Sequence, residues 1–370
     1  MEDRCDNNSV NKRTVLRIMG AYVAWVMGSG FATGQEILQF FTSYGYLSYV
    51  LLLVNLAGFL LIGPAILEAG CVHQKDEAFS QFRYFCGRRV GKFYEWFVPI
   101  SLFAGMVILI SGAGATLNQY YGLNHYAGAL LMAVMALTAY IVGFQRFVKV
   151  VSFVGPAIIV FTIIVGIITV VRDFDGLSAV ADYEAVMEDS RPVKYWWLSG
   201  LLYISYNLTG GSMYYTALGA TAENREEAVW GASLGTVALM LAILLMNSAM
   251  LSNIGVAGTL GIPTLYLARK ISFVLGAVFS VTLIFGIFSS CSAMLWTVSE
   301  RFVTQGTRKS IVFAAAVACA AFFLGLLPFA ELIGVIYPYL GYIGLIYVGC
   351  VAYRRLRNIR LKTGDIPLEK

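Results

Sequence analysis

Two glycine-rich polar stretches interrupt long apolar segments of this 370-residue chain. The first is Gly28-Ser29-Gly30, and the second is Asn207-Leu208-Thr209-Gly210-Gly211-Ser212. A glycine lowers the stability of a helix by about 1 kcal/mol relative to alanine, and hydrocarbon offers no partner for backbone groups that a break leaves unpaired. We therefore expect two such breaks within membrane helices only where they line a cavity.

The two ends of a broken helix can bind opposite charges. The half-helix that follows a break directs free N-terminal amides at the gap, which favours an anion such as a carboxylate. The half-helix that precedes the break ends in free carbonyls, which suit a cation or an ammonium group. Alternatively, Gly28 and Gly30 only permit close helix packing. Packing, however, requires neither the amide of Asn207 nor the hydroxyl of Thr209.

Other polar side chains within apolar segments are candidates for ion coupling. Carboxylates inside a membrane are costly and commonly functional. Glu36 follows the first break and is either a coupling or gating residue or an interfacial residue near the mouth. Glu68 can be a structural clamp, a proton carrier or an interfacial anchor. The hydroxyls of Ser289 and Ser290 suit Na⁺, although serine also bonds harmlessly to the carbonyl four residues back.

The composition indicates that membrane helices position these residues. Hydrophobic residues make up 59% of the chain and charged residues 13%, against about 25% charged in soluble domains, and the mean hydropathy is +0.74. Segments without charge are long enough for spans of about 20 residues. They predict an all-α integral membrane protein with ten transmembrane helices, at residues 14–42, 45–72, 92–120, 124–145, 147–172, 193–219, 226–252, 268–299, 309–328 and 330–353.

Ten helices suggest two halves of five that enter the membrane in opposite directions, which is an inverted repeat. Both breaks then fall in the opening helix of a half, the first and the sixth. Tyrosines that flank the second break are candidates to line a pocket. They are Tyr203, Tyr206, Tyr214 and Tyr215.

The distribution of positive charge predicts the orientation, because cytoplasmic loops carry more Lys and Arg. All but five of the 26 Lys and Arg residues fall in the chain ends and in alternate loops, which predicts a cell-membrane protein with both termini cytoplasmic. We expect a first repeat at 1–172, an acidic extracellular loop at 173–192, a second repeat at 193–353 and a basic tail at 354–370. The six cysteines are scattered, so no disulfide is expected.

The sequence lacks the motifs of several other function classes. It contains no nucleophile elbow, no phosphate-binding Gly-Lys-Ser/Thr loop and no His-Glu-x-x-His metal motif. The net charge of +5 follows from the topology and does not indicate nucleic-acid binding. We therefore expect neither an enzyme nor a cofactor. The expected partners are a small-molecule solute and the lipid bilayer, and transport without a nucleotide site requires an ion gradient.

The string Gly28-Ser29-Gly30-Phe31-Ala32-Thr33-Gly34-Gln35-Glu36 resembles the first helix of the amino acid, polyamine and organocation (APC) superfamily, and within it the YkvI-type membrane proteins. With the five-plus-five layout, the resemblance extends over nearly the whole chain. It implies the leucine-transporter fold, in which helices one, two, six and seven form a bundle that rocks against a scaffold of helices three, four, eight and nine.

The resemblance also implies a substrate site at the two breaks. Amides around Ser29, Gly30 and Phe31 would hold a substrate carboxylate, and the second break would complete the pocket. The implied substrate-binding residues are Met27, Gly28, Ser29, Gly30, Phe31, Tyr206, Asn207, Thr209, Gly210 and Gly211.

A sodium site is implied near Ala24, Met27, Ser289 and Ser290. The match departs from the pattern at Phe288, where similar sodium-coupled proteins have a hydroxyl. Coupling to H⁺ through Glu36 or Glu68 is the alternative to Na⁺. The expected function is a secondary active transporter, a cation-coupled symporter of an amino acid-like or amine solute that works by alternating access. The alternative is a membrane sensor that, like germinant-receptor subunits, binds an amino acid without transporting it.

Overall fold

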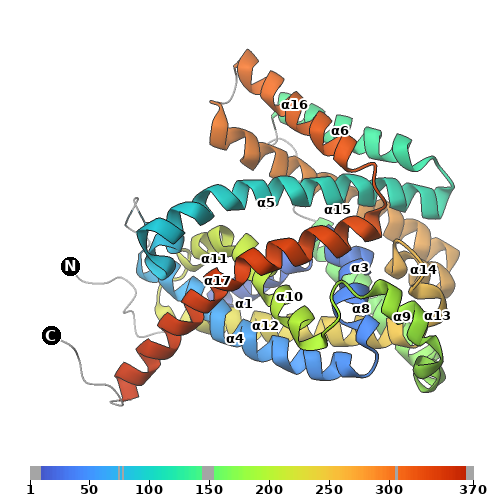
Figure 1. The fold of residues 1–370 in the computed structure, drawn as a ribbon, viewed down its shortest axis with the longest axis horizontal. Helices are drawn as coiled ribbons and strands as arrows, with labels where there is room; N and C mark the ends of the chain where they lie inside the picture. Colours follow the sequence, from blue (N-terminus) through green and yellow to red (C-terminus); the bar gives the residue numbers. More distant parts are fainter. Residues whose placement is uncertain (1–9, 74–75, 77–78, 144–153, 305–306, 364–370) are drawn as a thin grey trace.

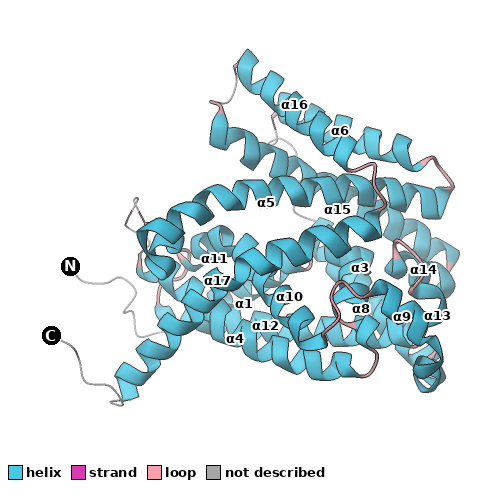
Figure 2. Ribbon diagram, viewed as in Figure 1, coloured by secondary structure: helices cyan, strands magenta, loops and turns pink. Residues whose placement is uncertain are grey.

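The computed structural model describes residues 10–73, 76, 79–143, 154–304 and 307–363 (Figure 1). Within these ranges, every regular element is a helix (Figure 2). The elements are α1 (Lys12–Val26), α2 (Ser29–Thr33), α3 (Gln35–Phe40), η1 (Thr42–Tyr44), α4 (Leu47–Val72), α5 (Gln81–Tyr121), α6 (His125–Val142), α8 (Val154–Arg172), η2 (Phe174–Tyr183), α9 (Glu184–Ser190), α10 (Trp196–Gly210), α11 (Ser212–Gly219), α12 (Arg225–Leu251), α13 (Ile254–Ala257), α14 (Pro263–Ile271), α15 (Phe273–Phe302), α16 (Arg308–Leu324) and α17 (Phe329–Thr363).

Polar residues at the loop junctions explain where several long helices begin and end. The side chain of Asn11 accepts a hydrogen bond from the Arg13 amide at the start of α1, and that of Asn224 accepts one from the Glu227 amide at the start of α12. Such caps satisfy amides that have no partner inside the helix. At its other end, α5 stops at Gly122, whose φ of 67° is left-handed and costs little in glycine.

Six of the described helices are long and apolar enough to cross a membrane, and a bent pair around Asp173 would make a seventh. The six are α4, α5, α6, α12, α15 and α17. The predicted first and sixth spans are each divided by a break into shorter helices, and α16 has only 17 residues. The chain is thus an all-helical membrane protein, while the count of ten spans and the inverted repeat remain predictions.

The outer faces of these helices are apolar, as contact with lipid requires. Leu53, Ile100 and Leu241 are each at least 60% exposed although they lie within long apolar helices. Exposed apolar surface of this extent would be unfavourable in water. In a bilayer it faces hydrocarbon.

The long helices form two groups, which are separated in Figure 1. The first group contains α1, α4, α10, α11 and α12, and the second contains α5, α6, α15 and α16. Within each group the helices pack on one another, and α17 packs on α10 of the first and on α5 of the second. The division into a rocking bundle and a scaffold remains a prediction.

Several helix boundaries in the structure differ from those predicted from the sequence. The helix expected at 92–120 already begins at Gln81, with a reversal at Gly87, whose φ is 76°. The helix expected at 268–299 is divided at Ser272 into α14 and α15. The last helix continues to Thr363, through part of the expected tail. The start of the helix expected at 147–172 lies outside the described residues.

The segment expected as an acidic loop, 173–192, contains the helices η2 and α9. These pack on η1 and α13, and α14 follows nearby at the same end of the molecule (Figure 1). We call this end the loop end. The opposite end, where α1 and α12 begin and α4 stops, we call the basic end; there Arg17 donates to the Thr221 carbonyl and Glu227 accepts from the Asn11 amide.

One expectation about the cysteines is wrong. Cys71, at the end of α4, is disulfide-bonded, whereas scattered spacing in the sequence suggested that no disulfide forms. Spacing along the chain carries no information on which side chains a fold brings together. Cys86, Cys291, Cys319 and Cys350 are free.

Candidate functional site

The first predicted break is a complete interruption of the helix. The last backbone bond of α1 joins the Met27 amide to the Val23 carbonyl (2.8 Å), and the next one joins Ala32 to Gly28 (3.1 Å). Gly28 is extended, with φ −72° and ψ −169°. Because α2 starts at Ser29, the amides of its first turn have no acceptor within their own helix.

A second interruption lies six residues after Gly28, where Gly34 separates α2 from α3 with a left-handed φ of 84°. A side chain here would be strained and would also collide with Met250 and Thr264. The hydroxyl of Thr33 donates to the Gly30 carbonyl (2.6 Å) and accepts from the Gln35 amide (3.2 Å). It thus satisfies polar backbone groups on both sides of the turn.

The second predicted break is much smaller. Only Gly211 separates α10 from α11, and its angles, φ −80° and ψ −6°, lie near the helical region. Its amide donates to the Asn207 carbonyl (2.9 Å) and its carbonyl accepts from the Tyr215 amide (2.8 Å). The helix is therefore bent here with its hydrogen bonds largely kept.

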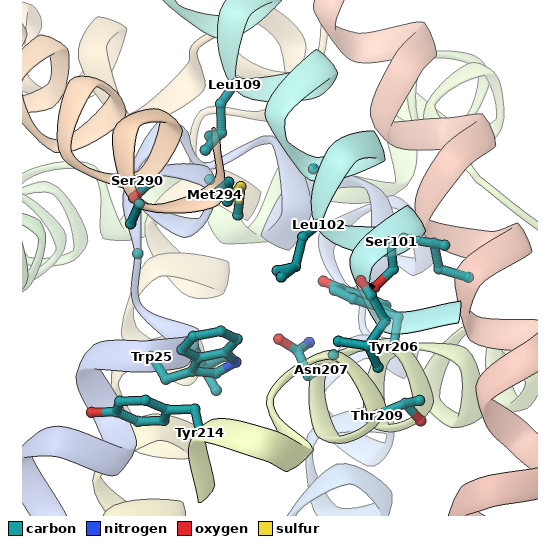
Figure 3. A pocket seen from close by; sticks show the side chains of 18 of the residues that line it. Trp25, Ser101, Leu102, Leu109, Tyr206, Asn207, Thr209, Tyr214, Ser290 and Met294 are labelled. Carbon is teal, nitrogen blue, oxygen red and sulfur yellow. Dashed lines mark hydrogen bonds between the residues drawn. The ribbon is translucent and has the colours of Figure 1, made fainter. Parts of the chain in front are cut away.

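A cavity of about 510 Å³ lies between the two helix groups, beside the first break. Residues from α1 to α3 and from α10 and α11 form one wall, and α5, α15 and α17 form the others (Figure 3). It extends along α5 from Leu109 to Phe97 and along α15 from Ser289 to Thr297, which is the direction of the basic end.

Glu36 is the one Asp, Glu, Lys, Arg or His residue in the cavity wall, as far as the structure describes it. Its side chain is 5% exposed. Its Oε2 accepts a hydrogen bond from the Tyr206 hydroxyl at 2.9 Å, and the Tyr337 hydroxyl also bonds the carboxylate. Donors from two other helices therefore stabilise this carboxylate in a site that is almost closed to solvent.

The carboxylate of Glu36 lies directly against Gly30. A Cβ added to Gly30 would collide with Oε1 of Glu36 and would lie 3.4 Å from the Tyr337 hydroxyl. Gly28 differs, because a Cβ there would meet only the Trp25 carbonyl, at 3.7 Å. The two glycines of the motif thus differ: other residues can adopt the extended backbone of Gly28, whereas the missing side chain of Gly30 makes room for the acid.

Aromatic pairs flank the cavity. The rings of Tyr206 and Tyr337 stack with centroids 4.6 Å apart and planes 10° from parallel. Trp25 and Tyr214 stack at 4.9 Å and 17° and lie together in Figure 3. Flat apolar faces next to a carboxylate suit a solute that combines a small hydrocarbon part with a positive charge.

Most of the predicted substrate residues line this cavity, but three do not. Those in the wall are Gly28, Gly30, Phe31, Tyr206, Asn207, Thr209 and Gly210. Met27 is buried in the core at the end of α1, and Ser29 begins α2 outside the lining. Gly211 also lies outside the lining. The rings of Trp25 and Tyr215 occupy the space that a side chain at this position would need.

The side chains from α10 differ in where they point. Asn207 projects toward the open centre of Figure 3 while its amide donates to the Tyr203 carbonyl (3.0 Å). Thr209 instead donates to the Gly344 carbonyl of α17 (3.4 Å). Of the four tyrosines suggested as lining, Tyr206 and Tyr214 reach the cavity, whereas Tyr203 and Tyr215 are fully buried in the core.

The candidates for ion coupling also separate in space. Glu68 lies outside the cavity and pairs with Arg355 of α17, which matches the structural clamp among its three interpretations. Ala24, Ser289 and Ser290 lie in the cavity wall, and α15, which carries the two serines, contacts α2. The side chain of Phe288 is buried. Met27 is buried and does not line the cavity.

Sequence reasoning missed Trp25, Tyr337 and the wall contributed by α5. Trp25 precedes Gly28 by about one helical turn, so helical spacing could have pointed to it. Tyr337 and the α5 residues Ser101 and Leu102 are far from both breaks along the chain. No local pattern in the sequence distinguishes them from other residues of apolar helices.

Comparison with known proteins finds two relatives of similar length. No family model matches the chain. The chain is 25% identical over 359 residues to the uncharacterized membrane protein YkvI of Bacillus subtilis, covering 93% of this chain and 97% of that protein. It is 20% identical over 339 residues to the uncharacterized protein YyaD of the same organism, covering 91% and 94%.

Among solved structures, the fold is similar to that of the manganese transporter of Eremococcus coleocola. Two mutants of that protein match with TM-scores of 0.56 and 0.53 at 15% and 14% identity. Both matches cover 91% of this chain and 78% of the transporter. The resemblance to YkvI-type proteins is confirmed, and the chain shares the fold of a known transporter.

Proposed function

We propose that this protein is a secondary active transporter of a small solute with a positively charged amine, either an amine or an amino acid. The observation that carries the proposal is the position of Glu36. It is a buried carboxylate that lines a cavity of about 510 Å³ at a complete break in a helix. An acid kept in such a costly place is expected to bind a charge that enters and leaves.

The charge of the cavity favours a cationic group over an anion. Glu36 is the one acidic side chain of the described lining, which contains neither Lys, Arg nor His. A free anion would meet this carboxylate without a compensating side chain. A zwitterion remains compatible, because the free amides at the start of α2 can hold its carboxylate while Glu36 holds its ammonium group.

The proteins of similar fold are described as manganese transporters, but we do not propose manganese as the substrate of this protein. Mn²⁺ prefers several oxygen ligands. Glu36 is the only carboxylate in the described cavity wall, and the described residues contain no group of three or more His, Cys, Asp and Glu side chains placed to share a metal. The donor set therefore fits an organic cation better than a divalent metal ion.

Alternating access is the proposed mechanism, with ten spans in two inverted repeats and both termini cytoplasmic. The cavity extends toward the basic end, so the described state would face the cytoplasm. At the other end, the aromatic rings of Phe40, Phe41 and Tyr203 pack together above Glu36. Rocking of the first helix group against the second, together with a movement of α3 away from α10 that separates these rings, would open the site to the outside.

The coupling ion is proposed to be Na⁺ or H⁺, and the two make different predictions. Na⁺ would bind between α1 and α15, near Ala24, Ser289 and Ser290, whereas H⁺ would bind Glu36. Replacing Ser289→Ala together with Ser290→Ala should abolish sodium dependence if Na⁺ is the ion. Equal uptake by wild type in sodium-free buffer with an imposed proton gradient would instead assign coupling to H⁺.

Uptake into liposomes tests the function as a whole. Purified protein is reconstituted and assayed for gradient-driven uptake of radiolabelled amines and amino acids. Glu36→Gln should reduce uptake at least about tenfold, since bonds to a charged group are worth about 1.5–3 kcal/mol. The matched control is Glu68→Gln, which removes only a partly exposed ion pair worth at most about 1 kcal/mol and should keep uptake within about twofold.

The outcomes separate the competing functions. Gradient-driven uptake that depends on Glu36 supports a transporter. Saturable binding of the same solute without any uptake would identify the sensor instead. Uptake that is unaffected by Glu36→Gln would refute the site proposed here, even if the protein transports.

A further inference from the structure

A second cavity, of about 500 Å³, lies at the loop end of the molecule. Its walls come from α3, from the end of α9, from the loop that follows α13 and from the start of α17. None of its lining residues belongs to the central cavity described above. The substrate proposal assigns it no role.

Two buried glutamines line this second cavity, and their side-chain oxygens have no hydrogen-bond partner in the described structure. Gln35 and Gln39 are one helical turn apart on α3 and are 3% and 5% exposed. The Gln39 amide nitrogen donates to the Ala330 carbonyl at 2.7 Å. Oε1 of both residues is buried without a hydrogen-bond partner within the described structure. A buried acceptor without a donor is costly, so the two oxygens indicate a ligand with N–H or O–H groups.

The charges around the glutamines favour a cation. The carboxylates of Asp189 and Glu331 lie at the rim and are exposed. Arg191 also lines the cavity, but its guanidinium is already paired with Glu184 at 2.5 Å and donates through Nε to the Ser43 carbonyl at 2.8 Å. Its charge is thus largely compensated, and two carboxylates remain for a ligand.

We propose that this second cavity is an outer binding site for the ammonium group of a small organic amine, formed by Gln35 and Gln39 below the carboxylates of Asp189 and Glu331. A primary ammonium group has three N–H donors, enough for both amide oxygens and one carboxylate. The inference rests on the proposed function for its biological meaning: the solute would bind here before it reaches Glu36.

Helix α3 connects the two sites. Gln35 and Gln39 face the outer cavity, while Glu36, next in sequence to Gln35, faces the central one. One short helix therefore presents amide oxygens on one side and a carboxylate on the other. A solute with a positive charge would exchange the first set of acceptors for the second as α3 moves.

The test measures binding of n-butylammonium to the purified full chain in detergent, by saturation-transfer NMR titration. n-Butanol and butyrate serve as the neutral and anionic counterparts. The titration is run in a Glu36→Gln background, in which the central site is disabled and the remaining signal comes from the outer cavity. We expect saturable binding of n-butylammonium there, and none of the other two compounds.

The decisive variant combines Gln35→Leu and Gln39→Leu in that background, which should weaken binding at least about tenfold. Gly334→Val provides a second variant that leaves both glutamines in place. A Cβ at Gly334 would lie 3.4 Å from Oε1 of Gln39, so the larger side chain should fill the site and also abolish binding. Glu188→Gln, which replaces an exposed acid outside the cavity lining, is the matched control and should leave binding unchanged.

Three results would overturn the outer site. They are loss of all n-butylammonium binding in Glu36→Gln alone, full binding in both the double-leucine and the Gly334→Val variants, and equal binding of n-butanol. The liposome uptake assay decides the proposed function separately. Glu36-dependent uptake without a second binding site would refute the outer site and leave the transporter intact.

Discussion

The two interrupted helices of this protein look alike in sequence and differ in structure. The helix around Gly28 is fully broken and then turns a second time at Gly34. The helix around Gly211 keeps hydrogen bonds on both sides of its glycine. The first therefore frees backbone groups beside the cavity, whereas the second contributes mainly through side chains such as Tyr206 and Asn207.

The difference lies in what the glycines permit. At the first break, the absence of a side chain on Gly30 admits the Glu36 carboxylate. At the second, its absence on Gly211 admits the rings of Trp25 and Tyr215. The missing side chain thus accommodates the Glu36 carboxylate in one helix and two aromatic rings in the other.

The largest expected effect is at Gly30. Gly30→Ala should reduce uptake by about 100-fold, because overpacking costs about 1–3 kcal/mol and here displaces the Glu36 carboxylate. Gly28→Ala is the matched control, since its Cβ has ordinary space and its φ is negative; uptake should change less than about threefold. Uptake by reconstituted protein, normalised to inserted protein, distinguishes the two. Equal loss in both variants would contradict the difference between these two glycines.

The next effect tests what the second helix contributes. Tyr206→Phe removes the hydroxyl that donates to Glu36 at 2.9 Å and keeps the ring that stacks on Tyr337. Apparent substrate affinity should fall about tenfold, as expected for the loss of a bond to a charged group. The concentration dependence of uptake measures it. A change in maximal rate at unchanged affinity would argue that the hydroxyl acts on coupling and not on the solute.

A smaller effect should distinguish packing from binding at the second break. Gly211→Ala should lower stability by about 1–3 kcal/mol through overpacking against Trp25. Gly210→Ala has open space around its Cβ and should be neutral or stabilising by up to about 1 kcal/mol. Thermal unfolding in detergent compares the two variants. If Gly211→Ala melts like wild type yet binds no substrate, the glycine belongs to the site after all.

The smallest effect is expected far from both breaks. Burial raises the pKa of Asp173, but hydrogen bonds from Lys270 and Asn253 outweigh it and hold that pKa below its ordinary value of 3.8. The stabilisation is then fully present above the ordinary pKa and is lost as pH falls through the lowered one. Asp173→Asn should cost at most about 1 kcal/mol. The difference in melting temperature from wild type should stay constant above about pH 5 and shrink below pH 3.8.

Local patterns in the sequence predicted the features that depend on neighbouring residues. Uncharged segments indicated membrane helices, and Gly28 and Gly30 marked a true break. The same patterns could not separate Glu36 from Glu68, because both are acids inside apolar segments. Only the fold shows that Glu36 meets Tyr206 in the cavity wall while Glu68 meets Arg355.

The remaining errors have similar causes. A glycine pair at Gly210 and Gly211 looks the same whether the helix unwinds or merely bends, since the outcome depends on Trp25 from another helix. Tyr337 reaches the site from the last helix, about 300 residues from the first break along the chain, and nothing in its own neighbourhood indicates this. Long-range packing decided both cases.

The position of α3 between the two cavities has an electrical consequence. If water fills both cavities, only a wall about 10 Å thick, the width of one helix, insulates the two sides, compared with about 30 Å for the hydrocarbon core. The membrane voltage would then fall mostly across α3, where one charge moved through the full potential changes energy by about 2.3 kcal/mol per 100 mV. For a cation that crosses the membrane, nearly all of the change in electrical energy would therefore occur as it passes this six-residue helix.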